Sequence, residues 1–155
     1  MPFEIKQLSA EDLALMRKLL LCFGAVFDEP HTYLERQPDD EYLQRLLAGD
    51  SFIALVAMAD GEVIGGLAAY ELKKFEQKRS EIHIYDLAVY ENYRRQGVAT
   101  ALINGVQPIA RERGAWVIFI QADWGDIAPI NLYTKLGRPE KIMHFDILIK
   151  KANPR

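Results

Sequence analysis

Apolar and polar positions along the chain change their period several times, and each change marks an expected helix or strand. Residues 3–8 alternate in the manner of a short strand. The next apolar side chains recur at helical spacing, at Leu13, Met16, Leu19, Leu20 and Phe23. Ser9 precedes them and is expected to cap this helix. A second helix is predicted over residues 39–48. Its inward side chains would be Tyr42, Leu43, Leu46 and Leu47.

The centre of the chain has a strand pattern. Residues 52–59 and 63–72 are expected to form a hairpin, because Asp60-Gly61 between them is a typical two-residue turn. Residues 80–89 form a third apolar run of strand length. Polar and aromatic residues at 27–33 are expected to form a loop between the first two helices.

The last third of the chain alternates between helix and strand patterns. A helix from about Arg95 to Arg113 contains Pro108, where a kink or a break is expected. A strand at 116–122, a helix at 126–136 and a final strand at 143–149 follow. The order β-α-α-β-β-β-α-β-α-β predicts an α/β fold with a mixed central sheet flanked by helices. Since the sequence has no repeat or linker, we expect a single domain over residues 1–155.

Composition narrows the class of protein. Hydrophobic residues make up 50% and charged residues 26% of the chain, which is typical of a globular domain. A net charge of −3 argues against nucleic-acid binding by phosphate neutralisation and slightly favours a cationic partner. The single cysteine, Cys22, excludes an internal disulfide and favours the cytoplasm, and we expect it to be a buried packing thiol. No leader pattern or run of 18 apolar residues is present, so neither export nor membrane attachment is expected.

The segment before the helix that contains Pro108 has the composition of an anion-binding loop. It consists of Tyr93-Arg94-Arg95-Gln96-Gly97-Val98-Ala99-Thr100. The first N–H groups of a helix have no intrahelical partner, and the helix dipole adds partial positive charge, so main chain alone can hold a phosphate there. Small residues let the ligand approach and the arginines add charge. The pattern is neither a G-x-G-x-x-G fingerprint nor a P-loop, and an arginine-rich helix start without a ligand is the alternative.

This loop resembles the acyl-CoA pyrophosphate loop of the GNAT superfamily of N-acetyltransferases, (R/Q)-x-x-G-x-(G/A). Residues 84–89 resemble the family strand that separates from its neighbour and offers free backbone groups to the pantetheine arm. Residues 131–137 resemble a later family helix, in which a tyrosine faces the thioester sulfur. The resemblance implies acetyl-CoA as co-substrate. No metal is expected, because no cluster of residues has metal-ligand spacing. The implied cofactor-binding residues are Leu87, Ala88, Val89, Arg94, Arg95, Gln96, Gly97, Val98, Ala99, Thr100, Asn131 and Tyr133.

A closer resemblance is to the type I aminoglycoside 3-N-acetyltransferases. Segments that carry it include Arg79-Ser80-Glu81-Ile82, Gln121-Ala122-Asp123 and Met143-His144-Phe145-Asp146-Ile147. It implies acetyl transfer to the 3-amino group of an aminoglycoside such as gentamicin, resistance to that antibiotic, and a homodimer. The chain departs from this pattern at Trp124, at Ile127 and at Arg138-Pro139. These departures concern the acceptor side, and therefore which aminoglycosides are accepted.

Acetyl transfer needs a polarised thioester carbonyl, a proton for the thiolate and a neutral amine. Backbone N–H groups near Leu87 and Val89 could polarise the carbonyl. The resemblance makes Tyr133 the proton donor, whereas its spacing alone indicates a packing aromatic. Asn131 could bind the cofactor's amide arm or lie on a solvated helix face.

The acceptor side needs negative charge, because an aminoglycoside is a polycation. Acidic residues available for this are Glu81, Asp86, Asp123, Asp126 and Asp146. Glu81, Asp123, Asp126 and Asp146 are the predicted substrate-binding residues, which we expect to converge at the sheet edge. The predicted base is Asp146 or Asp123, followed by Glu81. Each acid could also be an ordinary surface charge, and His83 and His144 could be structural or catalytic.

Two other functions agree with the same residues. One is a GNAT enzyme that acetylates another amine, such as a polyamine, a small molecule or a protein N-terminus. The other is a non-catalytic acyl-CoA-binding module, because a fold alone does not determine function.

Overall fold

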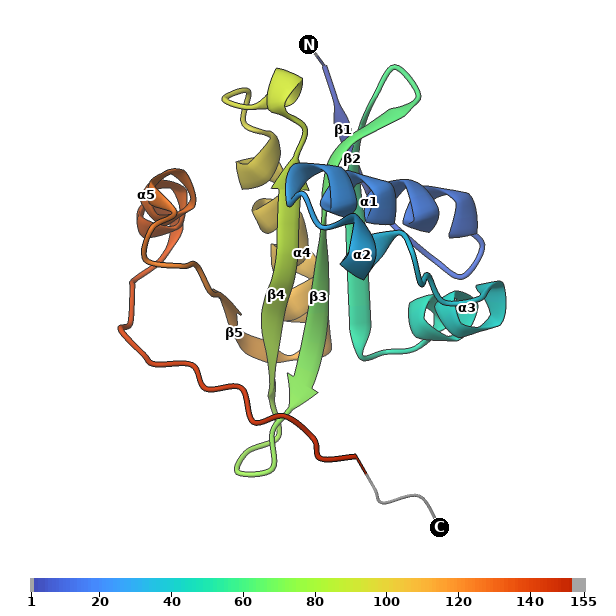
Figure 1. Ribbon diagram of the computed structural model, residues 1–155. Coiled ribbons are helices and arrows are strands. Elements are labelled where there is room, and N and C mark those ends of the chain that lie inside the picture. The colour runs from blue at the N-terminus through green and yellow to red at the C-terminus, as the bar shows by residue number, and fades with distance from the viewer. Residues whose placement is uncertain (1, 152–155) are drawn as a thin grey trace. The chain divides into compact units, whose positions relative to one another are not determined.

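The computed structural model describes residues 2–151, so the two ends of the predicted domain lie outside the described part. The chain divides into two compact units, Met1–Gln121 and Ala122–Arg155. The first unit contains a five-stranded sheet whose strands lie in the order β1-β2-β3-β4-β5. Helices cover both faces of this sheet, with α1 on one face and α4 on the other (Figure 1). The predicted α/β class with a mixed, helix-flanked sheet is confirmed.

The sheet is antiparallel except at one edge. Its strands are β1 (Glu4–Gln7), β2 (Phe52–Ala59), β3 (Glu62–Lys73), β4 (Ser80–Val89) and β5 (Ala115–Ile120). The first four pair antiparallel in sequence order, and β5 pairs parallel with β4. Asp60 and Gly61 have φ values of 50° and 78°, the left-handed conformation that a two-residue hairpin turn requires.

The helices differ from the predictions mainly at their ends. They are α1 (Leu13–Val26), α2 (Pro30–Tyr33), α3 (Asp40–Ala48), the 3-10 turn η1 (Glu91–Tyr93), α4 (Val98–Arg113) and, in the second unit, α5 (Ile127–Leu136). Asp12, not Ser9, is the N-cap of α1, and its carboxylate accepts the Ser9 N–H at 2.8 Å. The short helix α2 lies within the predicted loop. None of the described helices is both long and apolar enough to cross a membrane.

Two apolar layers hold the first unit together. Leu102 and Val106 of α4 are buried against one sheet face, and Leu19 and Phe23 of α1 against the other. Burying one such side chain fully contributes about 1.5–3 kcal/mol. Of the kink or break predicted at Pro108, the break is wrong, since α4 continues through Pro108 to Arg113.

Close packing between α1 and the sheet requires a glycine at position 66. A Cβ at Gly66 of β3 would collide with the Leu19 side chain and the Leu55 carbonyl oxygen. The prediction for one residue of α3, Tyr42, is wrong. Tyr42 of α3, predicted to face inward, is 61% exposed, whereas Leu43 and Leu47 are buried.

The predicted strand at residues 143–149 is absent from the described structure. The segment has no regular secondary structure, and its apolar side chains are exposed. Alternation of apolar residues defines one face of a strand, but a strand also needs a neighbour with which to pair. No pairing of this segment with another strand is found among the described residues, so the alternating pattern alone does not produce a strand here.

Candidate active site

The predicted anion loop connects the end of β4 with the start of α4. Arg95 and Gly97 both adopt left-handed backbone conformations, with φ values of 61° and 80°. Helix α4 therefore begins at Val98 and not at Arg95 as predicted, with Gly97 as its N-cap. The first-turn N–H groups of Val98, Ala99 and Thr100 have no carbonyl one turn earlier to which they could donate. No heavy atom lies within 4 Å of a Cβ built on Gly97, so the loop is open where a phosphate would approach.

Side-chain hydrogen bonds hold this loop in place. Arg94 Nε donates to the Val89 carbonyl oxygen at 3.2 Å, and Gln96 Nε2 donates to the Asn92 carbonyl oxygen at 3.3 Å. A left-handed conformation at a non-glycine residue such as Arg95 costs roughly 1 kcal/mol or more, and such residues are common at ligand sites. The structure thus brings two predicted cofactor segments, residues 87–89 and 94–100, next to each other.

Strand β4 has an open edge directly before the loop. Its pairing with β5 runs from Ser80 to Ile84, whereas its pairing with β3 continues to Val89. Among the described residues, the β4 backbone from Tyr85 to Val89 therefore lacks a strand on the β5 side. This geometry confirms the expected separation of the two strands. The free N–H groups along this edge could bind an acyl chain or polarise a carbonyl.

A β-bulge occurs at the same point of β4. Ala69 of β3 lies opposite Ile84 and Ala68 lies opposite Asp86, so Tyr85 has no partner in the ladder. A bulge of this kind bends the strand and redirects the side chains beside it. Asp86 and the 63% exposed Tyr85 follow the last residue of β4 that pairs with β5.

Asp86 is a carboxylate whose surroundings raise its pKa. It is half-buried, and its Oδ2 accepts a hydrogen bond of 2.9 Å from the Tyr33 hydroxyl of α2. Burial raises the pKa of Asp86, the nearby Glu29 charge raises it further, and the Tyr33 hydrogen bond opposes both. The sequence alone does not distinguish Asp86 from the other acidic residues. Its position immediately before Leu87, in the segment that resembles the family strand, was the available signal.

Glu81, a predicted base, occupies a different part of β4. It accepts a hydrogen bond of 3.1 Å from Trp116 Nε1 and lies 3.9 Å from Lys74 Nζ. Glu81 lies five positions before Asp86, which is about 16 Å along a strand. Glu81 therefore lies in the half of β4 that pairs with β5, away from the open edge.

The remaining predicted catalytic and acceptor residues belong to the second unit. Tyr133 on α5 is half-buried, and burial, followed by the Asp126 charge, raises its pKa. Asp126 is the N-cap of α5, and its N–H donates to the Asp123 carbonyl oxygen at 3.0 Å. The Asp146 carboxylate lies 2.8 Å from His144 Nε2. Convergence of these aspartates with Glu81 stays a prediction, as does the role of the exposed Asn131.

Two other titratable groups have packing roles. His83 is half-buried and stacks on Phe119 with ring centroids 4.5 Å apart, and burial lowers its pKa. Cys22 is fully buried in α1, as predicted, and burial raises the pKa of its thiol to about 11. Among residues 2–151, no group of three or more histidine, cysteine or acidic side chains is arranged to hold a metal ion.

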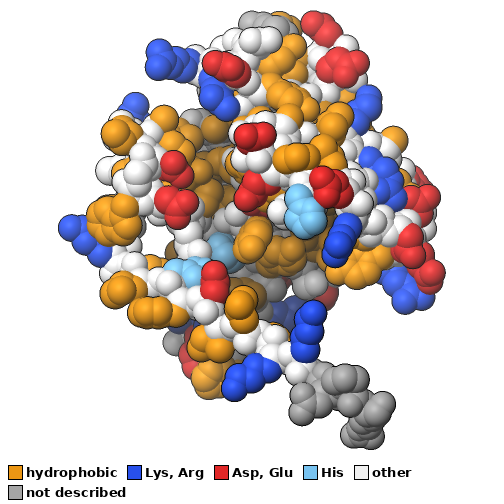
Figure 2. Space-filling model, in the orientation of Figure 1, with side chains coloured by type: hydrophobic (Ala, Val, Ile, Leu, Met, Phe, Trp, Pro, Cys, Tyr) orange, Lys and Arg blue, Asp and Glu red, His pale blue; other side chains and the backbone are white. Residues whose placement is uncertain are grey.

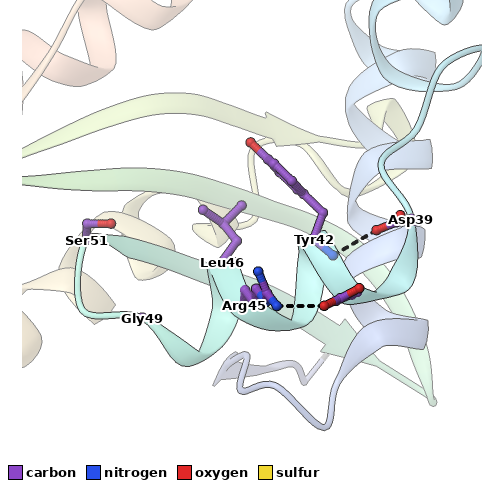
Figure 3. Close-up of a pocket in the computed structure, with 7 residues that line it drawn as sticks. Asp39, Tyr42, Arg45, Leu46, Gly49 and Ser51 are labelled. Carbon is purple, nitrogen blue, oxygen red and sulfur yellow. Dashed lines mark hydrogen bonds and ion pairs between the residues drawn. The ribbon is translucent and has the colours of Figure 1, made fainter.

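A surface hollow of about 530 Å³ lies along α3 (Figure 3). None of the predicted site residues lines it. The charged side chains that line it have partners, because Asp39 accepts the Tyr42 N–H at 2.9 Å and Arg45 contacts Glu41 at 2.7 Å. Figure 2 shows acidic side chains beside apolar surface elsewhere on the molecule.

Comparison with known proteins identifies the family. The model of the acetyltransferase (GNAT) family matches residues 14–137. The chain belongs to the GNAT acetyltransferase family. GNAT acetyltransferases use acetyl-CoA as the acetyl donor, which agrees with the phosphate-binding character predicted for residues 94–100.

Two solved structures are similar over nearly the whole chain. An aminoglycoside acetyltransferase from an uncultured soil metagenomic sample is 52% identical, with a TM-score of 0.94, covering 97% of this chain and 100% of that one. A second metagenomic aminoglycoside acetyltransferase, in complex with sisomicin, is 32% identical, with a TM-score of 0.85 and coverage of 96% and 97%.

Curated relatives match a shorter region. The N-alpha-acetyltransferase of Sulfurisphaera tokodaii is 33% identical over 92 residues, which is 55% of this chain and 55% of that protein. The chain spans about half the length of the curated relatives it matches.

Proposed function

We propose that this GNAT enzyme transfers an acetyl group from acetyl-CoA to the 3-amino group of an aminoglycoside of the gentamicin class, and thereby confers resistance in the cytoplasm. The observation that carries this proposal is the 52% identity to an aminoglycoside acetyltransferase over 97% of the chain. The half-buried Asp86 beside the open edge of β4 supports it, because a carboxylate there favours a cationic acceptor.

The proposed cofactor site follows the end of β4 into α4. The N–H groups of residues 97–100 and the charges of Arg94 and Arg95 would hold the pyrophosphate. Backbone groups of residues 87–89 would bind the pantetheine arm, with Asn131 as a further contact. Acetyl-CoA supplies a thioester whose carbonyl these backbone N–H groups polarise.

Proton transfer is proposed to use a carboxylate and a tyrosine. The acceptor's ammonium loses one proton to the Asp86 carboxylate, directly or through water, and its nitrogen forms a bond to the acetyl carbon. As the carbon–sulfur bond breaks, the Tyr133 hydroxyl supplies the proton for the sulfur. The second nitrogen proton restores Tyr133 through solvent, so one proton is released for each acetyl group transferred. Asp146, Asp123 and Glu81 are the other candidates for the base, and with Asp126 they would attract the polycation.

We further propose that the two units form one catalytic domain and that the enzyme is a homodimer. The family match runs from residue 14 to residue 137 and so includes most of both units. The exposed apolar segment at 143–149 and the outer edge of β5, which is unpaired among the described residues, would favour self-association. Sedimentation analysis of the purified chain tests this assembly.

The test of the proposed function is turnover of acetyl-CoA with a panel of amines. Gentamicin, sisomicin, spermidine and a peptide with a free N-terminus would each be supplied at matched concentrations, and NMR of the product would identify the acetylated nitrogen. We expect acetylation of gentamicin at its 3-amino group. Preferred acetylation of the peptide would favour N-terminal acetylation instead, as the match to the Sulfurisphaera N-alpha-acetyltransferase allows. Acetyl-CoA binding without turnover of any amine would indicate a binding module.

A further inference from the structure

We propose that Tyr33 is a positioning residue for the acceptor amine, which acts by fixing the Asp86 carboxylate at the open edge of β4. This inference rests on the proposed function and extends it to the α2 segment, for which the sequence predicts only a loop. The two side chains are 53 positions apart in the sequence, and the fold joins them through a single hydrogen bond of 2.9 Å.

Aromatic packing fixes the ring of Tyr33. Its centroid lies 5.7 Å from that of Phe23 and 5.8 Å from that of Phe27, and these two rings stack on each other at 5.6 Å. Rings in such contact add about 0.5–1.5 kcal/mol per pair beyond the burial of their area. The Tyr33 hydroxyl therefore points at Asp86 from a rigid support.

The backbone of Tyr33 is also held to α1. Gln37 Nε2 donates to the Tyr33 carbonyl oxygen at 3.1 Å, and Gln37 Oε1 accepts from Arg17 of α1 at 2.7 Å. Arg17 also contacts Asp40 at 2.6 Å. These bonds connect the segment after α2 with α1 and α3, so that Tyr33 is fixed at both its ring and its main chain.

The hydrogen bond orients one carboxylate oxygen and leaves the other available. Tyr33 donates to Asp86 Oδ2, and no hydrogen bond to Oδ1 is found among the described residues. Burial, followed by the Asp86 carboxylate, raises the pKa of Tyr33, so its hydroxyl remains a donor at neutral pH. Without this donor the Asp86 side chain could rotate away from the amine.

The groups around Asp86 determine its pKa, so the proposal predicts a specific change in the pH dependence of activity. Titratable groups that act on this site are Glu29 before α2, Tyr33 on α2, Tyr70 on β3 and Tyr85 beside Asp86 on β4. The Tyr33 hydrogen bond lowers the pKa of Asp86 against the effects of burial and Glu29. Removing the hydroxyl therefore raises the pKa of Asp86 and shifts the acidic limb of the pH profile to higher pH.

The experiment is a double-mutant cycle between Tyr33→Phe and Asp86→Asn, with gentamicin and acetyl-CoA as substrates. Tyr33→Phe keeps the aromatic packing and removes only the hydroxyl. We expect kcat/KM for gentamicin to fall by at least about tenfold, as for loss of a hydrogen bond to a charged group, with an unchanged KM for acetyl-CoA. In the Asp86→Asn background, the same substitution should change kcat/KM by less than about twofold.

Tyr42→Phe is the matched control, because Tyr42 is an exposed tyrosine of the neighbouring helix α3, and it should leave kcat/KM and the pH profile unchanged. An equal loss from Tyr33→Phe in both backgrounds, or an unshifted acidic limb, would show a merely structural role and overturn this inference alone. Parent-like kinetics of Tyr33→Phe would do the same. A parent enzyme that acetylates no amine would overturn the proposed function together with this inference.

Discussion

The two units of the chain differ in how many of their apolar side chains are buried. In Met1–Gln121, apolar side chains are buried on both faces of the sheet. From Ala122 to residue 151 no residue is buried, and each of five apolar side chains between 143 and 149 is at least 73% exposed. The first unit therefore supplies a rigid frame for the anion loop and Asp86. The second carries Tyr133 and three aspartates on a segment that contributes little stability of its own. Substitution of a buried side chain should accordingly lower stability in the first unit, whereas substitutions in the second unit should leave stability nearly unchanged.

The largest expected effect concerns Tyr133 in the second unit. Tyr133→Phe removes the proposed proton donor and should lower kcat by about 10²–10⁴-fold. Steady-state kinetics with gentamicin measure this, while calorimetry should find acetyl-CoA affinity and thermal unfolding close to those of the parent. Turnover within about twofold of the parent would return Tyr133 to a packing role.

Candidates for the catalytic base occur in both units, so their substitutions can be compared directly. Asp86→Asn should lower kcat/KM for gentamicin by roughly 100-fold, because it removes the proton acceptor. Asp146→Asn and Asp123→Asn should each cost less than about fivefold, as for the loss of an exposed charge. If the order is reversed, the base lies in the second unit, as the sequence predicts.

The difference in packing can be measured with one substitution made in each unit. Leu102→Ala removes a fully buried side chain of α4 and should lower the free energy of unfolding by about 2–5 kcal/mol. Leu148→Ala, at a position that is 86% exposed, should change it by less than about 0.5 kcal/mol. Urea unfolding of both variants provides the values, and equal losses would mean that Leu148 is buried in the assembled enzyme.

The role of the anion loop can be tested by comparing substitutions at two glycines that share a left-handed conformation, Gly97 in the loop and Gly61 outside it. Gly97→Glu places bulk and negative charge where the pyrophosphate is proposed to bind, and should weaken acetyl-CoA binding by about tenfold or more. Gly61→Glu is the control, because Gly61 also has a positive φ and open surroundings but lies in the β2–β3 turn. Calorimetry on folded protein should find the loss at Gly97 alone, and parent-like affinity would contradict the assigned pyrophosphate site.

The smallest expected effect is the pH dependence caused by His83. Since burial lowers its pKa below the ordinary value of 6.5, the unfolded chain binds more protons than the folded one as pH falls through 6.5. The free energy of unfolding should therefore decrease as pH drops from about 6.5 to the folded-state pKa, and then level off. His83→Gln should reduce this slope in urea titrations at a series of pH values. An unchanged slope would show that His83 titrates alike in both states.

The sequence predicted correctly the strands and turns that depend on the properties of neighbouring residues. The apolar run at residues 80–89 matches β4 residue for residue, and Asp60-Gly61 forms the expected turn. The start of α4 was predicted three residues too early, because hydrophobic periodicity does not reveal the left-handed backbone at Arg95 and Gly97.

Features that depend on distant partners could not be predicted in this way. The bulge at Tyr85 arises from the register between β3 and β4, and the surroundings of Asp86 depend on a tyrosine 53 positions earlier in the sequence. For the same reason the alternation at residues 143–149 predicted a strand without identifying what would pair with it.

The buried thiol of Cys22 makes the chain a convenient carrier for spectroscopic labels. Because it is the only cysteine, is fully buried and has a pKa of about 11, it should stay inert toward maleimide at neutral pH in the folded protein. Cysteines introduced at exposed positions, one in each unit, could then carry a donor and an acceptor dye without removal of the native residue. Energy transfer between them would follow the separation of the two units in solution as acetyl-CoA is added.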